Sequence, residues 1–234
     1  MQTDESLALA LARGEGVPTV RVYGWAPWAL SLGWNQSQDD IRAEKAESDG
    51  IDIVRRPTGG RAVLHAQELT YTVVMPAEGR NVGEVYRLIS RGLVAGVQRM
   101  GIPAAIETSS PSASSLYRGA ACFVSAARFE IKVGGKKVIG SAQRRYAGTG
   151  GDVVLQHGSI LLGGAHTAIT EYLVLPEQER EELATELHER STDLGAILGR
   201  IVSFEEAAAA VRSGFEESWG VTFQTAPSLE GHTA

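Results

Sequence analysis

The only cysteine of the chain and a lysine downstream of it are the residues best suited to nucleophilic chemistry. Cys122 lies in the segment Ala-Ala-Cys-Phe, and Lys137 begins the segment Lys-Val-Ile-Gly-Ser-Ala-Gln, which follows an expected hairpin turn. A cation beside a thiol favours the thiolate, which is the nucleophilic form of cysteine. If the fold brings the two side chains together, the expected chemistry is acyl transfer through a thioester.

A segment with three arginines and two adjacent glycines is the first candidate for a ligand site. It reads Arg-Arg-Pro-Thr-Gly-Gly-Arg over residues 55–61. Paired glycines after a strand let a ligand approach the backbone closely, and arginines can bind phosphate or carboxylate through two parallel hydrogen bonds. A structural turn is the alternative. The predicted substrate-binding residues of this segment are Arg56, Thr58, Gly59, Gly60, Arg61 and His65.

Two later segments combine small and polar residues. In Gly-Ser-Ala-Gln, small residues at a strand end leave room for a ligand, and the serine and glutamine can donate hydrogen bonds to a carbonyl group. A bulge on an edge strand is the alternative. In Leu-Gln-His-Gly-Ser, a histidine precedes a glycine that can open the backbone onto a site; the alternative is a satisfied core histidine. The predicted substrate-binding residues here are Gly140, Ser141, Ala142, Gln143, His157, Gly158 and Ser159.

Composition and charge limit the classes of protein to which the chain can belong. The formal net charge is −6, which argues against general nucleic-acid binding. Residues 54–65 and 131–151 nevertheless contain basic side chains and no acidic ones. Such windows suit an anionic substrate or an acidic partner, and solvated strand ends are the alternative. The histidines show no metal-ligand spacing, so no metal site is predicted.

The chain also lacks features of secreted and membrane proteins. One cysteine excludes an intramolecular disulfide, no apolar run approaches the roughly 20 residues that span a bilayer, and the first residues are not basic. These features predict a cytoplasmic protein with neither a membrane nor a nucleic acid as partner.

Hydrophobic periodicity and turn residues predict a single α+β domain over residues 4–224, with helices packed on a mostly antiparallel mixed sheet. A disordered tail is expected over 225–234 and a loop over 107–119. Helices are expected at 4–13, 39–48, 83–100, 177–190 and after a Ser203–Glu206 capping box. Strands are expected at 19–23, 29–33, 51–55, 62–64, 69–75, 129–133, 137–139, 152–162 with an interruption at Gly158, and 221–223.

Taken together, the three candidate segments resemble the signature stretches of the biotin/lipoate protein ligase superfamily, in the same order. The resemblance covers about residues 4–220 and implies the catalytic-domain fold of that superfamily. ATP-dependent lipoate ligases usually have Gly-Arg-Asn-Asp before the lysine hairpin. This chain has Ala-Cys-Phe instead, followed by Arg-Phe-Glu-Ile, and is similar to the lipoate-ligase-like octanoyltransferases that use a cysteine nucleophile.

The resemblance implies a function without a cofactor. An octanoyl group would pass from acyl carrier protein to Cys122 as a thioester, and then to a lysine of a lipoyl domain of a 2-oxoacid dehydrogenase or of glycine cleavage protein H. Lys137 would stabilise the thiolate or the oxyanion. Because acyl carrier proteins and lipoyl domains are generally acidic, Arg144 and Arg145 are predicted to help dock one of them. The predicted walls of an apolar acyl slot are Val63, Leu64, Val73 and Ile139.

Two alternatives stay open at this point. The first is an ATP-dependent lipoate or octanoate ligase that uses ATP and Mg²⁺, in which Cys122 is a small buried side chain. The second is a non-catalytic module that binds an acyl group or a partner on the same fold. The chain also departs from its relatives in two respects: they have another strand before the first helix, and they often have Asp where Ala66 stands.

Overall fold

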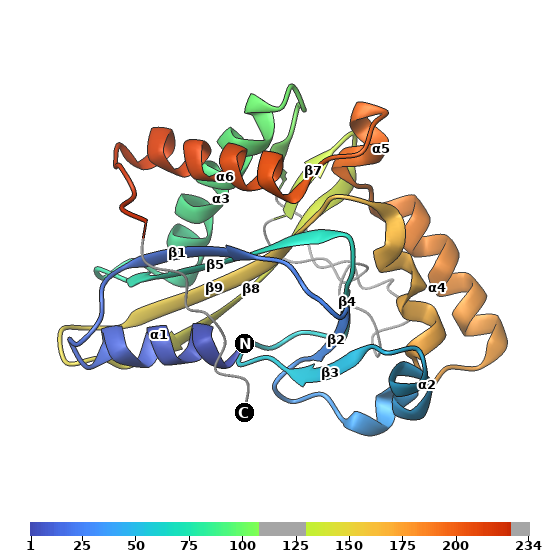
Figure 1. Cartoon of the computed structure of the whole chain (residues 1–234). Coiled ribbons are helices and arrows are strands. Elements are labelled where there is room, and N and C mark those ends of the chain that lie inside the picture. Colours follow the sequence, from blue (N-terminus) through green and yellow to red (C-terminus); the bar gives the residue numbers. More distant parts are fainter. Residues whose placement is uncertain (108–129, 226–234) are drawn as a thin grey trace.

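The computed structural model describes residues 1–107 and 130–225. Cys122 and nearly all of the predicted tail and the predicted loop lie outside the described residues. The described parts form two β-sheets with helices packed around them, which confirms the expected α+β class and its mostly antiparallel strands (Figure 1).

The larger sheet has six strands, and every neighbouring pair in it is antiparallel. Across the sheet their order is β1 (Thr19–Tyr23), β5 (Glu68–Pro76), β9 (Val153–Leu161), β8 (Lys136–Tyr146), β7 (Glu130–Val133) and β6 (Ala105–Glu107). In the smaller sheet, β2 (Ala29–Leu32) lies between β3 (Asp52–Arg55), which is parallel to it, and β4 (Val63–His65), which is antiparallel.

Two helices, α3 (Val82–Arg99) and α6 (Phe204–Trp219), cover one face of the larger sheet, and α1 (Gln2–Ala12) packs on the other face (Figure 1). Apolar residues of α3 at helical spacing face the sheet, and a capping box formed by Asn81 and Glu84 starts the helix. The two covering helices approach closely, because a Cβ atom on Gly214 would overlap the backbone of Gly96.

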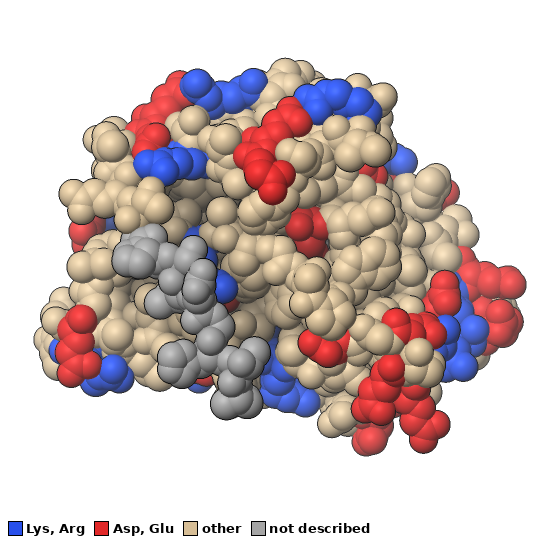
Figure 2. All heavy atoms as spheres, in the orientation of Figure 1, with Lys and Arg blue, Asp and Glu red and all other residues tan. Residues whose placement is uncertain are grey.

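The remaining elements surround the smaller sheet and the far end of the larger one. They are η1 (Gln38–Asp40), α2 (Ala43–Ser48), η2 (Gly164–Tyr172), α4 (Glu177–Arg190) and α5 (Leu194–Leu198). Among the described residues, no helix has the length and apolar character needed to cross a bilayer. Acidic side chains gather over α2 and α4, at the lower right of Figure 2, in keeping with the negative net charge.

Several predicted boundaries were wrong. Residues 221–223 are not a strand, and the helix expected over 39–48 is the short η1 followed by α2. Ser203 caps α6 by accepting the Glu206 backbone N–H, but the Glu206 carboxylate pairs with Arg200 instead of completing a capping box. Strand β9 runs through Gly158 without interruption. The glycine there allows close strand packing, because a Cβ atom would overlap the carbonyl oxygen of Gly140 on the neighbouring strand.

Candidate active site

Residues of all three candidate segments line one small cavity of about 30 Å³ between the two sheets. The pairing of β8 with β9 brings the second and third segments together, with Gly140 opposite Ser159 and Ala142 opposite His157. The first segment reaches the same cavity from the smaller sheet. The residues of the three segments that line it are Arg56, Val63, His65, Gly140, Ser141, Ala142, His157, Gly158 and Ser159.

The second segment lies in the middle of β8 rather than at a strand end, so its side chains alternate between two faces. The Ser141 hydroxyl accepts a hydrogen bond of 2.7 Å from Tyr71, a core residue beneath α3 and α6. The Gln143 amide donates to Gln156 at 3.0 Å, and Gln156 donates to Tyr71. Both side chains thus join a hydrogen-bonded network with the buried Tyr71 and Gln156, and their predicted role as donors to a substrate carbonyl stays a prediction.

The arginine beside the double glycine is committed to the protein itself. The Arg56 side chain is buried and donates to the carbonyl oxygens of Ser31 at 3.1 Å, Gly59 at 3.1 Å and Arg61 at 2.6 Å. Arg55 likewise donates to backbone carbonyls, at Gly33, Trp34 and Gln36. These bonds hold the turn in shape. Gly59 and Gly60 remain exposed at its tip, and the positive φ of 100° at Gly60 favours glycine.

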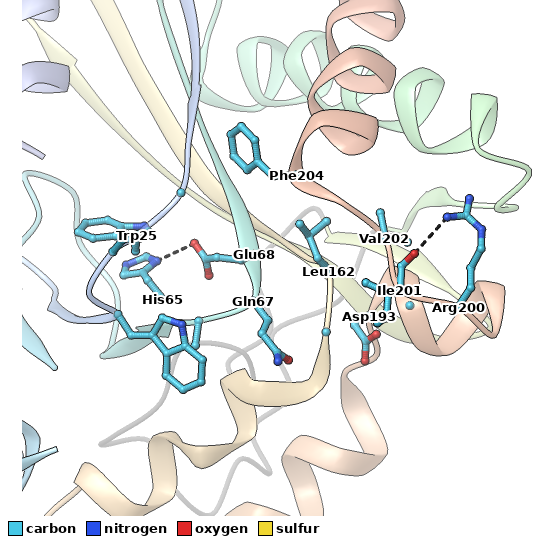
Figure 3. Close-up of a pocket in the computed structure, with 16 residues that line it drawn as sticks. Trp25, His65, Gln67, Glu68, Leu162, Asp193, Arg200, Ile201, Val202 and Phe204 are labelled. Atoms are coloured by element: carbon cyan, nitrogen blue, oxygen red, sulfur yellow. Dashed lines mark hydrogen bonds and ion pairs between the residues drawn. The ribbon is translucent and has the colours of Figure 1, made fainter. Parts of the chain in front are cut away.

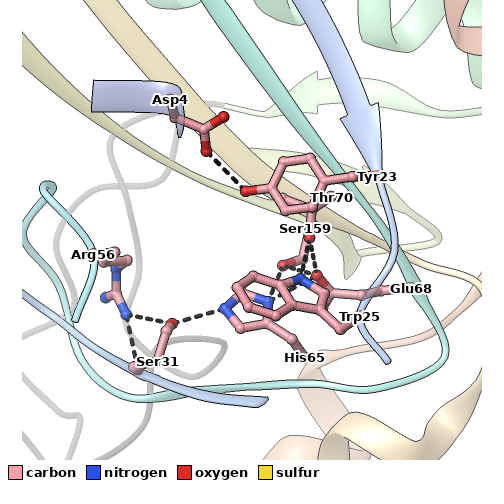
Figure 4. Close-up of polar contacts among 9 residues, drawn as sticks. All are labelled: Asp4, Tyr23, Trp25, Ser31, Arg56, His65, Glu68, Thr70 and Ser159. Carbon is pink, nitrogen blue, oxygen red and sulfur yellow. Dashed lines mark hydrogen bonds and ion pairs between the residues drawn. The ribbon is translucent and has the colours of Figure 1, made fainter. Parts of the chain in front are cut away.

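His65 is clamped on both ring nitrogens (Figure 4). Its Nε2 lies 2.7 Å from the Ser31 hydroxyl, its Nδ1 lies 2.8 Å from Glu68 Oε1, and its ring stacks on Trp25 at 4.6 Å. Ser, His and Glu in this order resemble the triad of a hydrolase. Ser31, however, is fully buried and lines neither this cavity nor the larger one described below. The arrangement therefore makes His65 a rigid wall of the cavity.

Glu68, which sequence reasoning missed, organises this wall. Its Oε1 also accepts hydrogen bonds from Thr70 at 2.6 Å and from Ser159 at 2.9 Å. The carboxylate therefore ties β4, β5 and β9 together at the cavity. Little in the sequence indicated this role of Glu68, which lies just beyond residues 54–65, the segment noted for its lack of acidic side chains.

His157 is a neutral histidine on the floor of the cavity. Burial lowers its pKa from the ordinary value of 6.5 to about 3, and the charge of Arg56 adds to the effect. Its Nε2 lies 2.6 Å from the Thr58 hydroxyl, while Nδ1 has no hydrogen-bond partner among the described residues. At neutral pH this ring can position a polar group but carries no charge.

A β-bulge turns the Lys137 side chain toward the face of the larger sheet on which His157 lies. Lys132 of β7 faces Lys137 of β8, but Ile131 faces Ile139, so two steps on β8 match one step on β7. Val138 and Ile139 are both buried in the core beneath α3 and α6. By strand alternation Gly140 points to the other face, and the extra residue brings Lys137 to that same face.

The ammonium of Lys137 lies in a buried charge cluster. Its Nζ is 3.2 Å from Glu130 Oε1, and the side chains of both residues are 6% exposed. The other oxygen of Glu130 lies 3.2 Å from Lys132 Nζ. Glu130 immediately precedes the window counted as free of acids. Because Cys122 lies outside the described residues, its pairing with Lys137 stays a prediction.

The two arginines predicted to dock a partner also have contacts within the chain. Arg144 donates to the Pro57 carbonyl at 2.9 Å, and its guanidinium lies 4.7 Å from the ring centroid of Trp34. Arg145 donates to the Arg80 carbonyl at 2.6 Å and lies 3.6 Å from Asp152. Both side chains remain partly exposed, so their docking role stays a prediction.

Of the four residues predicted to form the walls of an acyl slot, one lines the small cavity. Val63 lines the small cavity, but Leu64 is buried beside the smaller sheet, and Val73 and Ile139 are buried beneath α3 and α6. β-strand alternation points the last two away from the site.

A second and larger cavity of about 900 Å³ shares His65 as a wall (Figure 3). Its apolar lining includes Trp25, Trp28, Leu162, Val202 and Phe204.

No group of three or more metal-ligating side chains occurs in the described ranges 1–107 and 130–225. The described groups available for chemistry are the buried ammonium of Lys137 and the neutral imidazole of His157, beside the closely packed strands β8 and β9.

Comparisons with known proteins agree with this architecture. Two proteins named octanoyltransferase LipM are similar to this chain in sequence: that of Exiguobacterium sp. is 40% identical, covering 96% of this chain and 83% of its own length, and that of Symbiobacterium thermophilum is 43% identical, covering 95% and 82%.

Solved structures show the same fold at lower sequence identity. A bipartite lipoate protein ligase from Thermoplasma acidophilum superimposes with a TM-score of 0.75 at 21% identity, covering 98% of this chain and 84% of that one. A lipoate-protein ligase A bound with ATP gives a TM-score of 0.73 at 21% identity, covering 97% and 85%. Residues 1–216 match the sequence profile of the lipoyl protein ligase A/B catalytic domain. The chain therefore belongs to the lipoyl protein ligase A/B catalytic domain family, as its three signature segments indicated.

Proposed function

We propose that this protein is an octanoyltransferase of protein lipoylation. It takes an octanoyl group from acyl carrier protein, holds it as a thioester on Cys122, and transfers it to a lysine of a lipoyl domain or of glycine cleavage protein H. The observation that carries the proposal is the similarity, at 36–43% identity over nearly the whole chain, to proteins named octanoyltransferase. The proposal includes a cytoplasmic location, where a reducing environment keeps the single cysteine as a thiol.

The first half-reaction exchanges one thioester for another. The Cys122 sulfur attacks the carbonyl carbon of the octanoyl thioester, a new carbon–sulfur bond forms, and the bond to the carrier sulfur breaks. The carrier leaves as a thiolate and takes up the proton that the Cys122 thiol released. Since the two thioesters have similar energy, this step needs no ATP.

The second half-reaction makes an amide. The acceptor lysine attacks as a neutral amine, the carbon–nitrogen bond forms, and the bond to the Cys122 sulfur breaks. The proton lost by the amine nitrogen neutralises the departing thiolate. An amide is more stable than a thioester, so the transfer is downhill.

The described residues support this chemistry through charge and shape. Negative charge develops on the attacked carbonyl oxygen, and a buried ammonium such as that of Lys137 stabilises it more strongly than it would in water. Gly140 and Gly158 let β8 and β9 pack closely behind the cavity.

The test is the intact mass of the purified protein after incubation with octanoyl-acyl carrier protein in the absence of ATP. We expect one octanoyl adduct that hydroxylamine removes and that the Cys122→Ala variant does not form. Addition of a lipoyl domain should then move the adduct to that domain. Labelling of the domain that requires ATP and free octanoate, and that survives Cys122→Ala, would establish a ligase instead. Absence of any transfer under both conditions would favour a binding module.

A further inference from the structure

We propose that Glu130 is a positioning residue that acts through Lys137, holding its ammonium on the sheet face that carries the cavity. The proposal rests on the proposed function and deepens it, because it identifies the carboxylate that prepares the lysine for the thioester chemistry. Glu130 was not among the residues that the sequence pointed to.

The geometry gives Glu130 a place between two lysines. Its Oε1 lies 3.2 Å from Lys137 Nζ and its Oε2 lies 3.2 Å from Lys132 Nζ. Glu107 of β6 extends the cluster, with Oε2 3.6 Å from Lys132 Nζ. The carboxylate thus bridges an ammonium on its own strand and one on the neighbouring strand.

The bulge makes this bridge possible. Glu130 and Lys132 are two residues apart on β7, so both point to the face opposite the buried Ile131. Without the extra residue on β8, Lys137 would share the core face of Ile139. The bulge therefore brings the ammonium of Lys137 to the same side as the carboxylate of Glu130.

Burial gives the pair its importance. The side chains of Glu130 and Lys137 are each 6% exposed, whereas that of Glu107 is 46% exposed. A buried charge that loses its partner is strongly disfavoured and moves toward water or loses its charge. Backbone bonds such as that from the Thr192 N–H to the Lys137 carbonyl hold the strand, and the ion pair with Glu130 contributes to the position of the ammonium.

A buried ion pair can also be only a structural contact, and the two roles differ in one measurable respect. A positioning residue acts on the reaction only through Lys137, so its removal has no further effect once Lys137 is gone. Removal of a purely structural residue lowers the rate independently of Lys137, so the fold-losses of the two single variants multiply in the double variant.

The experiment is a double-mutant cycle on the rate of Cys122 acylation by octanoyl-acyl carrier protein, followed by rapid quenching and intact-mass analysis. Glu130→Gln keeps the size of the side chain and removes its charge. We expect a loss of about 10²–10³-fold in the acylation rate at saturating donor, the range seen when an oxyanion-stabilising group is removed. The half-saturating donor concentration should stay within about twofold. In the Lys137→Met background, Glu130→Gln should change the rate by less than about twofold.

Two further variants sharpen the result. Glu107→Gln is the matched control, since it removes a carboxylate of the same cluster whose ion pair among the described residues is with Lys132. Its rate should remain within about twofold of wild type. Glu130→Asp keeps the charge and should recover part of the lost rate. Urea denaturation of each variant shows which ones are folded.

The proposal would be overturned if Glu130→Gln were acylated at the wild-type rate, or if the double variant showed the product of the two single fold-losses in rate. Failure of the proposed function gives a different pattern, in which wild-type protein forms no octanoyl adduct. The same cycle is then measured with iodoacetamide, which alkylates the only cysteine and needs no acyl donor. Slower alkylation in both single variants, with no further loss in the double variant, supports positioning by Glu130. If Lys137→Met is alkylated more slowly than wild type while Glu130→Gln is alkylated at the wild-type rate, the proposal is refuted.

Discussion

His157 and Thr58, which lie 99 positions apart, are joined by a 2.6 Å hydrogen bond between Nε2 and the threonine hydroxyl. The bond links the centre of β9 to the arginine–glycine turn that follows β3. It therefore ties the third signature segment to the first, across the cavity that both of them line.

Removal of this hydroxyl should destabilise the protein. Thr58→Val preserves the shape of the side chain but leaves the buried His157 without its partner, and an unsatisfied buried polar group costs about 1–3 kcal/mol. Urea denaturation should show a fall of that size in the free energy of unfolding. Thr58→Ser retains the hydroxyl and serves as the control, with a smaller loss. Equal stability of the valine variant and the wild type would show that the bond contributes nothing.

Stability should fall at acidic pH because of His157. Burial lowers its pKa to about 3 in the folded protein from the ordinary value of 6.5, so the unfolded chain binds a proton more readily between these values. The contribution is fully present above about pH 6.5 and is lost progressively as pH falls toward 3. One extra proton bound by the unfolded state corresponds to about 1.36 kcal/mol per pH unit, or about 2 kcal/mol between pH 7 and pH 5.

The variant His157→Gln should remove this part of the pH dependence. Urea unfolding at pH 7 and pH 5 measures it, and the difference between the two pH values should shrink by about 2 kcal/mol relative to wild type. His188 is exposed on α4, so His188→Gln should leave the difference unchanged. A variant at position 157 with the full wild-type difference would contradict the neutral buried histidine.

Close packing of β8 against β9 should make Gly158 intolerant of a side chain. A Cβ atom there would overlap the Gly140 carbonyl oxygen and lie 2.9 Å from the Tyr71 ring. Gly158→Ala should therefore lower the free energy of unfolding by about 1–3 kcal/mol, the usual cost of overpacking. Gly59 has open space around its Cβ position, so Gly59→Ala is the matched comparison and should cost less than about 0.5 kcal/mol. Thermal unfolding distinguishes the two.

The docking role of Arg144 and Arg145 predicts a dependence on salt. The paired variant Arg144→Gln and Arg145→Gln should raise the half-saturating concentration of octanoyl-acyl carrier protein several-fold at low salt and make transfer less sensitive to ionic strength. Because Arg144 also supports the Pro57 carbonyl, stability must be measured in parallel. An unchanged salt dependence in a folded variant would remove both residues from the docking surface.

From the sequence alone we could predict candidate residues for the chemistry and most of the helices and strands to which they belong. The periodicity of 83–100 predicted α3, and the strands expected at 129–133 and 137–139 predicted the hairpin of β7 and β8, because these features depend on neighbours in the chain. The three signature segments indicated the family. Each of these inferences rests on local patterns, which survive without knowledge of the partners in space.

Only the tertiary structure decided which way those residues point and what neutralises them. Strand alternation points the Ser141 hydroxyl toward Tyr71 in the core and places Ala142 on the opposite face, and a bulge at Val138 brings Lys137 to that opposite face as well. A bulge depends on the register between strands, which long-range pairing sets. Likewise, Glu130 and Asp152 lie just outside the acid-free window, yet the sheet brings them to Lys137 and Arg145. Charge along a sequence and charge around a side chain differ because folding chooses the neighbours.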